Sequence, residues 1–190
     1  MPSRQEDLLD AAIGVLGNQG VRALTHRAVD AAAGMPLGSA ANYFKTRDAL
    51  ISAVVERFAE RDRIAWRAIA GFVQPSDPGE LATALTGYVL RALGPERPVT
   101  VARYGLFIEA ALRPALQEHL AESAAELRRW ATQWLRAIGS TQPDADCTAI
   151  MDYLDGLILH QLAFPGPPDT LAAAIDRTVR TLITVNRAAP

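Results

Sequence analysis

The stretch from Leu24 to Leu50 restricts the possible folds more than any other part of the chain. Thr25 is a residue type that caps the start of a helix, and Gly34 is the type that ends one in a left-handed conformation. A second run of small residues follows the glycine, and we predict short helices over residues 27–33 and 37–43. Two short helices joined by a glycine-containing turn are typical of a helix-turn-helix, whose second helix fits the major groove of DNA.

Glycine and proline divide the rest of the chain into segments of helical length. Ser3 and Glu6 form a capping box that begins a first helix, which continues to about Asn18 before Gly20 ends it. Breakers and apolar residues at helical spacing predict further helices over residues 46–72, 77–94, 98–112, 114–138, 144–164 and 169–186. No segment alternates apolar and polar residues over the length of a strand. The sequence therefore predicts an all-α fold of about nine helices.

Composition restricts the class of protein. Nearly half of the 190 residues are apolar, which is enough for a substantial core, yet no apolar run approaches the ~20 residues of a membrane span. The N-terminus lacks the apolar segment of a signal peptide, and the single cysteine, Cys147, excludes an intramolecular disulfide. We therefore expect a soluble cytoplasmic protein with no membrane partner. Because the net charge is −2, any affinity for nucleic acid must come from locally placed cations and helix N-termini.

The spacing of particular residue types over residues 25–50 also shows a family resemblance. The run T-x-R-x-V-x-x-A-A-G-x-x-x-G-S-x-x-x-Y-F-x-x-R-D-x-L, which follows an amphipathic helix, resembles the DNA-binding domain of TetR-type transcriptional repressors. The motif-level resemblance covers roughly residues 5 to 50, and beyond it only helical character, length and layout agree. It implies an N-terminal DNA-binding domain over residues 1–47 and a ligand-binding and dimerisation domain over residues 48–190.

The resemblance assigns the recognition helix to residues 37–43. Side chains expected to meet base edges are Leu37, Ser39, Ala40 and Asn42, with Gly38 among the small residues that let the backbone approach closely. The expected phosphate contacts are Thr25, Tyr43, Lys45 and Arg47, and His26 and Arg27 are expected to reach either backbone or bases. We expect Phe44 to be a core residue. The chain departs from the usual family pattern at Pro36 and Ala41, where hydroxyl-bearing residues are common.

The C-terminal helices supply candidates for a small-molecule pocket and for a dimer interface. Relatives bind effectors among these helices, and the aromatic or polar-tipped candidates here are Tyr104, Phe107, Glu109, Trp130, Trp134, Tyr153, His160 and Phe164. The same aromatic residues could instead be ordinary core. The last two predicted helices carry apolar seams suited to helix packing, which indicates a homodimer through Leu154, Ile158, Leu171, Ile175, Thr178, Leu182 and Val185. The alternative is that the two helices bury each other within one chain.

No pattern in the chain indicates catalysis, a metal site or a cofactor. His26, His119 and His160 are far apart in sequence, and there is no H-E-x-x-H, G-x-S-x-G, Walker loop or G-x-G-x-x-G. We expect a homodimeric transcriptional regulator, most simply a repressor, that a small-molecule effector releases from palindromic double-stranded operator DNA. Two other interpretations stay open, namely a helical ligand-binding dimer without operator binding and a protein-interaction adaptor that uses the N-terminal helices for docking.

Overall fold

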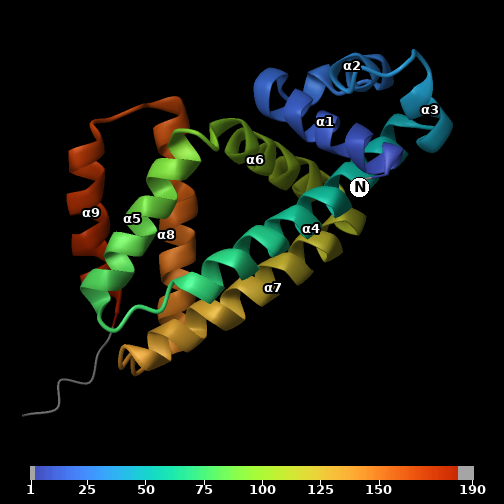
Figure 1. The fold of residues 1–190 in the computed structure, drawn as a ribbon. Helices are drawn as coiled ribbons and strands as arrows, with labels where there is room; N and C mark the ends of the chain where they lie inside the picture. Colours follow the sequence, from blue (N-terminus) through green and yellow to red (C-terminus); the bar gives the residue numbers. More distant parts are fainter. Residues whose placement is uncertain (1–2, 184–190) are drawn as a thin grey trace, which may run out of the picture. The chain divides into compact units, whose positions relative to one another are not determined.

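The computed structural model describes residues 3–183, apart from the side chains of Ala70 and Phe72. Over these residues the chain forms helices and no strand, which confirms the predicted all-α fold (Figure 1). The elements are α1 (Arg4–Gln19), η1 (Val21–Ala23, a 3₁₀ turn), α2 (His26–Ala32), α3 (Ser39–Tyr43), α4 (Arg47–Phe72), α5 (Pro78–Leu93), α6 (Arg97–Leu112), α7 (Pro114–Ala137), α8 (Pro143–Ala163) and α9 (Pro168–Leu182). None of these helices is both long and apolar enough to cross a membrane.

The helix ends follow the capping residues that the sequence shows. The amide of Glu6 donates to Ser3 Oγ at 3.2 Å, and the amide of Ser3 donates to Glu6 Oε2 at 2.6 Å, which completes the capping box of α1. Asp77 Oδ1 accepts from two amides in the first turn of α5. Gly139 takes a left-handed conformation (φ 85°) at the end of α7.

The chain divides into two compact units, and the first contains residues up to 64 together with residues 96–123. Apolar side chains of α1, α2, α4 and α6 form its core, among them Leu8, Leu16, Val54 and Leu106. α6 lies so close to α1 that a Cβ built on Gly17 would be 2.1 Å from the carbonyl oxygen of Pro98. Only glycine fits at position 17 without moving the backbone of α6.

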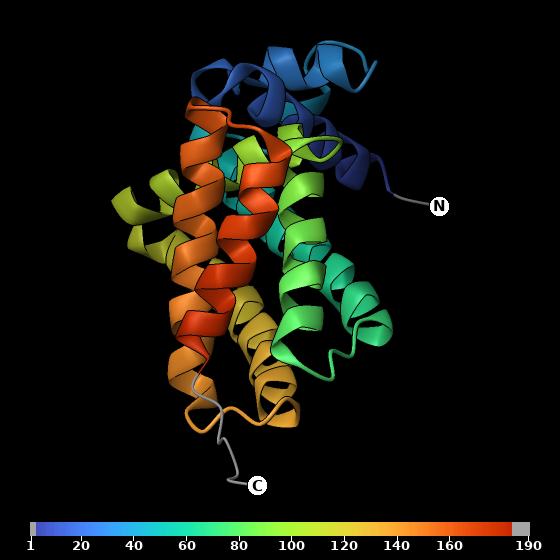
Figure 2. The ribbon, with the colours of Figure 1, turned by 90° about the vertical axis from the view of Figure 1, so that its left-hand side faces the viewer.

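The second unit contains residues 65–95 together with residues from 124 onward. Here α5, α8 and α9 run side by side, as Figures 1 and 2 show. Leu171, Ile175 and Val179 form the buried face of α9. The rings of Trp66 and Tyr88 pack together with centroids 4.9 Å apart.

The buried seam of the second unit corrects four of the predicted interface residues. Leu154, Ile158, Leu171 and Ile175 are all less than 9 % exposed within a single chain, so they have no surface to offer a second copy. The packing also differs from the alternative that the last two helices bury each other, since α9 packs mainly against α5, and the dimer interface stays a prediction. Thr178 and Leu182 are half-buried, and Val185 lies outside the described residues. Helical periodicity identified the apolar face of α9 but did not say which surface it packs against.

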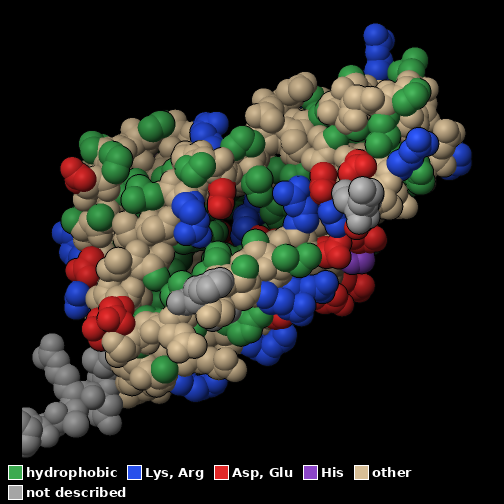
Figure 3. Space-filling view, in the orientation of Figure 1, with side chains coloured by type: hydrophobic (Ala, Val, Ile, Leu, Met, Phe, Trp, Pro, Cys, Tyr) green, Lys and Arg blue, Asp and Glu red, His purple; other side chains and the backbone are tan. Residues whose placement is uncertain are grey.

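The contacts do not divide the chain at residue 47, because α4 as far as Ile64 and the whole of α6 belong to the same compact unit as α1. The boundary between residues 1–47 and 48–190 therefore stays a prediction about function. Over the face shown in Figure 3, Lys and Arg side chains are dispersed among Asp and Glu. This distribution agrees with the small net charge of the chain.

Candidate nucleic-acid interface

The first helix of the predicted helix-turn-helix, α2, is closed at both ends by local hydrogen bonds. Thr25 Oγ1 accepts from the amide of Ala28 at 3.2 Å. At the other end Gly34 is left-handed (φ 63°), its amide donates to Ala31 O, and the amide of Met35 donates to Asp30 O. This pair of bonds is a Schellman motif, which confirms the predicted helix stop at Gly34.

The recognition helix α3 is shorter than predicted, and a side chain from another helix caps its N-terminus. It begins at Ser39 rather than at Leu37, after Gly38 in a left-handed conformation (φ 93°) that supplies no capping side chain. The carboxylate of Asp30, on α2, accepts from the amide of Gly38 and from the amide of Ala40, each at 2.7 Å. Ser39 Oγ donates to Pro36 O at 2.6 Å, so its hydroxyl closes the turn.

The end of α3 is tied back to the start of α2. The Nε2–H of His26 donates to the carbonyl oxygen of Phe44 at 2.7 Å, because a carbonyl oxygen can only accept. Phe44 is buried and Tyr43 is half exposed, which confirms the expectation that only Phe44 is core. The partly buried His26 thus has a structural bond across the motif, while its contact with DNA stays a prediction.

The start of α4 carries a second capped N-terminus next to exposed cations. Thr46 Oγ1 accepts from the amide of Ala49 at 3.0 Å. Arg47 is exposed and donates one hydrogen bond from Nη2 to the carbonyl oxygen of Val21, at 3.1 Å. Lys45 precedes them and is exposed. Two hydroxyl-capped helix ends and two cations therefore lie around the short recognition helix.

The exposed residues of this surface include most of the predicted DNA contacts. They are Thr25, Arg27, Leu37, Asn42, Tyr43, Lys45 and Arg47, while Gly38, Ser39 and His26 are half-buried. Ala40 is wrong as a base contact, because it is 0 % exposed and belongs to the core under α3. In so short a helix about one residue per turn faces the core, and the continuous run of small residues from Gly38 to Ala41 gave no sign of which one.

Behind this surface, α4 is attached to α1 by an ion-pair cluster that the sequence did not reveal. Arg57 donates from Nε and Nη2 to both carboxylate oxygens of Asp10, at 2.9 and 3.0 Å, and from Nη1 to Glu6 and Glu60. The hydrogen bond from Arg57 lowers the pKa of Asp10, and the same bond raises the pKa of Arg57 above its usual value. The hydrogen bonds from Ser3 lower the pKa of Glu6. Both carboxylates are therefore held ionised.

The predicted effector residues fall in both units. Tyr104 and Phe107 pack edge to face in the first unit, at 5.8 Å between centroids, and Glu109 there pairs with Arg113. The other five residues, Trp130, Trp134, Tyr153, His160 and Phe164, belong to the second unit. A single pocket formed by all eight residues stays a prediction.

One pocket of the second unit contains two of the predicted aromatic residues. Its described lining comes from the end of α4, the α4–α5 connection and α7, and consists of Arg67, Gly71, Gln74, Pro75, Trp130, Gln133, Trp134 and Ala137. Arg67 Nε donates to Glu126 Oε1 at 2.7 Å. The two indoles are one helical turn apart, so both reach the same hollow.

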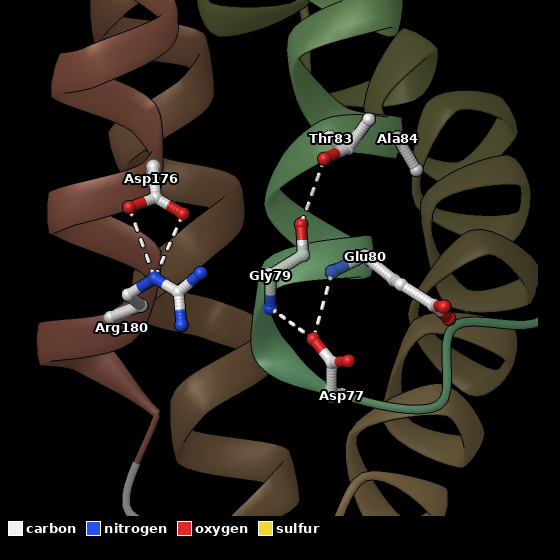
Figure 4. Close-up of a pocket in the computed structure, with 7 residues that line it drawn as sticks. All are labelled: Asp77, Gly79, Glu80, Thr83, Ala84, Asp176 and Arg180. Carbon is white, nitrogen blue, oxygen red and sulfur yellow. Dashed lines mark hydrogen bonds and ion pairs between the residues drawn. The ribbon is translucent and has the colours of Figure 1, made fainter.

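A second hollow, between α5 and α9, contains none of the predicted residues (Figure 4). Its polar groups bond to one another: Asp77 caps α5, and Arg180 Nε donates to both oxygens of Asp176, at 2.8 and 3.0 Å. The guanidinium of Arg180 also lies against Gly79. These bonds explain the side chains as helix caps and an ion pair of the fold. Among the described residues, no group of three or more His, Cys, Asp or Glu could hold a metal ion.

Comparison with known proteins gives a consistent set of similarities. Residues 76–185 match the family model described as tetracyclin repressor-like, C-terminal domain. The HTH-type transcriptional regulator BetI of Rhizobium meliloti is 28 % identical over 181 residues, which are 93 % of this chain and 86 % of that protein.

Solved structures resemble the chain along almost its whole length. A TetR-family member from Streptomyces coelicolor is 32 % identical with a TM-score of 0.68, and the alignment covers 97 % of this chain and 100 % of that one. The multidrug binding protein EbrR in complex with ethidium is 31 % identical with a TM-score of 0.71, covering 96 % of this chain and 100 % of that one. EbrR was also solved with proflavin and with malachite green.

Proposed function

This chain belongs to the TetR family of transcriptional regulators, and from that premise we propose that it is a homodimeric repressor. In this proposal α3 of each subunit reads one half of a palindromic operator, and a small-molecule effector releases the protein from DNA. The observation that carries the proposal is the exposed surface of α3 between two hydroxyl-capped helix N-termini, with Arg27, Lys45 and Arg47 exposed around it.

The exposed side chains of this surface suit base and phosphate contacts of different kinds. Asn42 can accept a hydrogen bond from the N6 amino group of adenine and donate one to N7, and Leu37 can touch a thymine methyl group. Thr25 and Thr46 stand at helix N-termini, whose remaining amides favour a phosphate oxygen. Lys45 and Arg47 add positive charge beside those ends. We propose that these residues, rather than a general basic field, supply the affinity for DNA.

Dimerisation is proposed through the residues of α8 that a single chain leaves uncovered. Leu159 and Phe164 are large apolar side chains more than half exposed, and Gly156, His160 and Ala163 are exposed beside them. These residues recur at helical spacing, so they share one face of α8. A two-fold dimer through this face would present two recognition helices to a palindromic site.

The effector is proposed to be an aromatic molecule with several rings. The indoles of Trp130 and Trp134 in one pocket support this class, since aromatic rings stack well on indole faces. The dyes bound by the related EbrR structures are of the same kind. Effector binding can release DNA only if the effector binds the DNA-free form more tightly than the DNA-bound form.

The test of operator binding is a titration of the purified protein with DNA from its own upstream region, at several salt concentrations. We expect Arg47→Ala to weaken binding to all sequences and to lower the salt slope by about one phosphate contact. Asn42→Ala should instead change the preferred sequence. Matched controls are Arg136→Ala and Asn18→Ala, exposed residues outside this surface. Upstream DNA that binds no better than random DNA at low salt would contradict the proposal.

The same titration separates the two other interpretations. A ligand-binding dimer without an operator would bind malachite green but would show no salt-sensitive preference for any upstream sequence. An adaptor would show neither. For the effector, malachite green is titrated against the free protein and the protein–operator complex, with operator alone as the blank. Equal affinity for the two protein forms would rule out release by population shift.

A further inference from the structure

Asp30 is a buried carboxylate in the middle of the DNA-binding motif. It lies on α2 and is 2 % exposed, the only Asp or Glu of residues 3–64 that is fully buried. Both of its oxygens accept hydrogen bonds at 2.7 Å, Oδ2 from the amide of Gly38 and Oδ1 from the amide of Ala40. Because a buried carboxylate is costly unless it is hydrogen-bonded, these two bonds are strongly favoured over any arrangement that lacks them.

The two amides belong to the start of the recognition helix, where no side chain of α3 or of its N-cap accepts them. α3 contains five residues, fewer than an isolated helix needs to be stable in water. Its N-cap is Gly38, which has no side chain and a φ of 93°. The Asp30 carboxylate therefore takes the place of the missing capping side chain.

Because this cap comes from a different helix, it also affects the orientation of α3 relative to α2. An ordinary capping residue fixes only the first turn of its own helix. From its place on α2, Asp30 bridges the amide of Gly38, the N-cap of α3, and the amide of Ala40, so it fixes how the start of α3 is placed and turned relative to α2. Ala40 at the same end is packed in the core. The direction in which Asn42 and Tyr43 point from the protein follows from this placement.

The carboxylate also decides where phosphates can bind. The N-terminus of a helix ordinarily attracts anions, but at α3 a carboxylate already occupies the amides of Gly38 and Ala40. The caps of α2 and α4 are the neutral hydroxyls of Thr25 and Thr46. The chemistry of the three ends therefore separates phosphate contacts at α2 and α4 from base contacts at α3.

We propose that Asp30 is a positioning residue for sequence recognition: by bridging the amides of Gly38 and Ala40 it holds α3 in the orientation that reads bases, without itself touching DNA. This role rests on the proposed operator binding. Loss of the Asp30 carboxylate should lower the discrimination between operator and random DNA, and it should not weaken the sequence-independent attraction to phosphates.

The experiment compares the wild type with Asp30→Asn and Asp30→Ala in the full-length protein. Asparagine keeps one acceptor oxygen of similar placement, whereas alanine keeps none. The matched control is Asp146→Asn, because Asp146 is a buried aspartate of the second unit that accepts from Ser140 Oγ at 2.6 Å. Affinities for the operator and for random DNA are measured across a salt series, and amide exchange at Gly38 and Ala40 is measured without DNA.

We expect the ratio of operator to random-DNA affinity to fall in the order wild type, Asp30→Asn, Asp30→Ala, by about tenfold or more for alanine, as for the loss of a charge-assisted hydrogen bond. Affinity for random DNA and its salt slope should stay unchanged or rise slightly, since a negative charge is removed. The amides of Gly38 and Ala40 should exchange faster in both variants. Asp146→Asn should leave the affinity ratio and both amides unchanged.

Three results would overturn the proposal. The first is an unchanged affinity ratio in variants whose two amides exchange faster, which would make Asp30 a cap of stability alone. The second is a parallel loss of affinity for all DNA, which would show that the helix-turn-helix unfolds. The third is unchanged amide protection, which would show that the carboxylate does not hold α3. A wild type without sequence preference would instead contradict the operator proposal itself, and the amide exchange would still show whether Asp30 holds α3.

Discussion

The helix-turn-helix and the α5–α8–α9 layer solve the same problem, fixing one helix against another, by different means. In the helix-turn-helix, the Asp30 carboxylate accepts hydrogen bonds from the backbone of a neighbouring segment, and His26 and Arg47 donate to backbone carbonyl oxygens. In the second unit, α9 is fixed by an apolar seam in which Ile175 and Val179 are fully buried. Directional bonds to backbone atoms set an orientation, whereas an apolar seam supplies stability that depends mainly on buried area.

The difference follows from helix length. α9 has three buried positions along its buried face, but α3 is a helix of little more than one turn with Ala40 as its buried residue. A single alanine cannot define the rotation of a helix by packing. Polar bonds must do so. We therefore expect a large loss of stability when a buried apolar side chain of the second unit is removed. Removing a charged side chain of the first unit should cause a smaller loss that depends on salt and pH.

The largest effect is expected at the apolar seam. Ile175→Ala removes a fully buried side chain of α9, and the lost burial together with the cavity should lower the free energy of unfolding by about 2–4 kcal/mol. Chemical denaturation at low and high salt measures it, and the loss should not depend on salt. Arg177→Ala, an exposed change on the same helix, is the control with an expected effect within about 0.5 kcal/mol. Similar losses for both variants would contradict the assigned packing.

A smaller loss is expected at the ion-pair cluster between α1 and α4. Arg57→Leu leaves Asp10, Glu6 and Glu60 close together without their shared cation, and should cost about 1–2 kcal/mol at neutral pH, because the acidic partners are partly exposed to solvent. Denaturation midpoints at several salt concentrations measure the loss. Arg61→Leu, which removes one hydrogen bond to Asp10, is the matched control and should cost less.

The same cluster predicts a dependence on pH. The pKa of Asp10 is lowered in the folded protein, chiefly by the hydrogen bond from Arg57, so the unfolded chain binds more protons in acid. The stability from this pair is therefore fully present above the ordinary pKa of an aspartate and is lost as the pH falls through the lowered one. The difference between wild type and Arg57→Leu should shrink from about pH 5 to about pH 3. A difference that grows in acid would contradict the assignment.

The smallest effects are expected at two glycines of the first unit. Gly34→Ala places a side chain at φ 63° with nothing within 4 Å of the added Cβ, so the cost is conformational and about 1 kcal/mol. Gly14→Ala, in the middle of α1 and also with nothing within 4 Å, should instead stabilise by up to about 1 kcal/mol. Thermal unfolding of the two variants measures both changes. Shifts of the same sign would contradict the left-handed conformation of Gly34.

Local signals were sufficient to predict the helices. The capping box at Ser3 and Glu6, the stop at Gly34 and the caps at Thr25 and Asp77 each act within a few residues, so the sequence shows them directly. The start of α3 moved by two residues, and α9 ends at Leu182, before the predicted residue 186. The exposure of Asn42, Lys45 and Arg47 also agrees with the surface that the motif predicted.

The sequence could not show which helix faces meet. The seam of Leu171 and Ile175 was visible as a pattern, but the same pattern fits a partner chain or a helix of the same chain, and α5 proved to cover it. Asp30 and Arg57 were missed for a related reason, since their partners, apart from Glu60, lie 8 to 51 residues away. A lone aspartate within the alanine-rich α2 was the only available signal of the first.

The close approach of Gly17 to Pro98 has a consequence for building chimeric regulators. A chimera that joins only residues 1–47 to the C-terminal helices of another regulator would place this glycine against the backbone of a different helix. Where the foreign helix stands further away, the graft would leave a void, and where it stands closer, the two main chains would collide. A DNA-binding unit of this protein that can be transferred is therefore discontinuous in sequence. It has to include residues 96–112 together with the N-terminal helices.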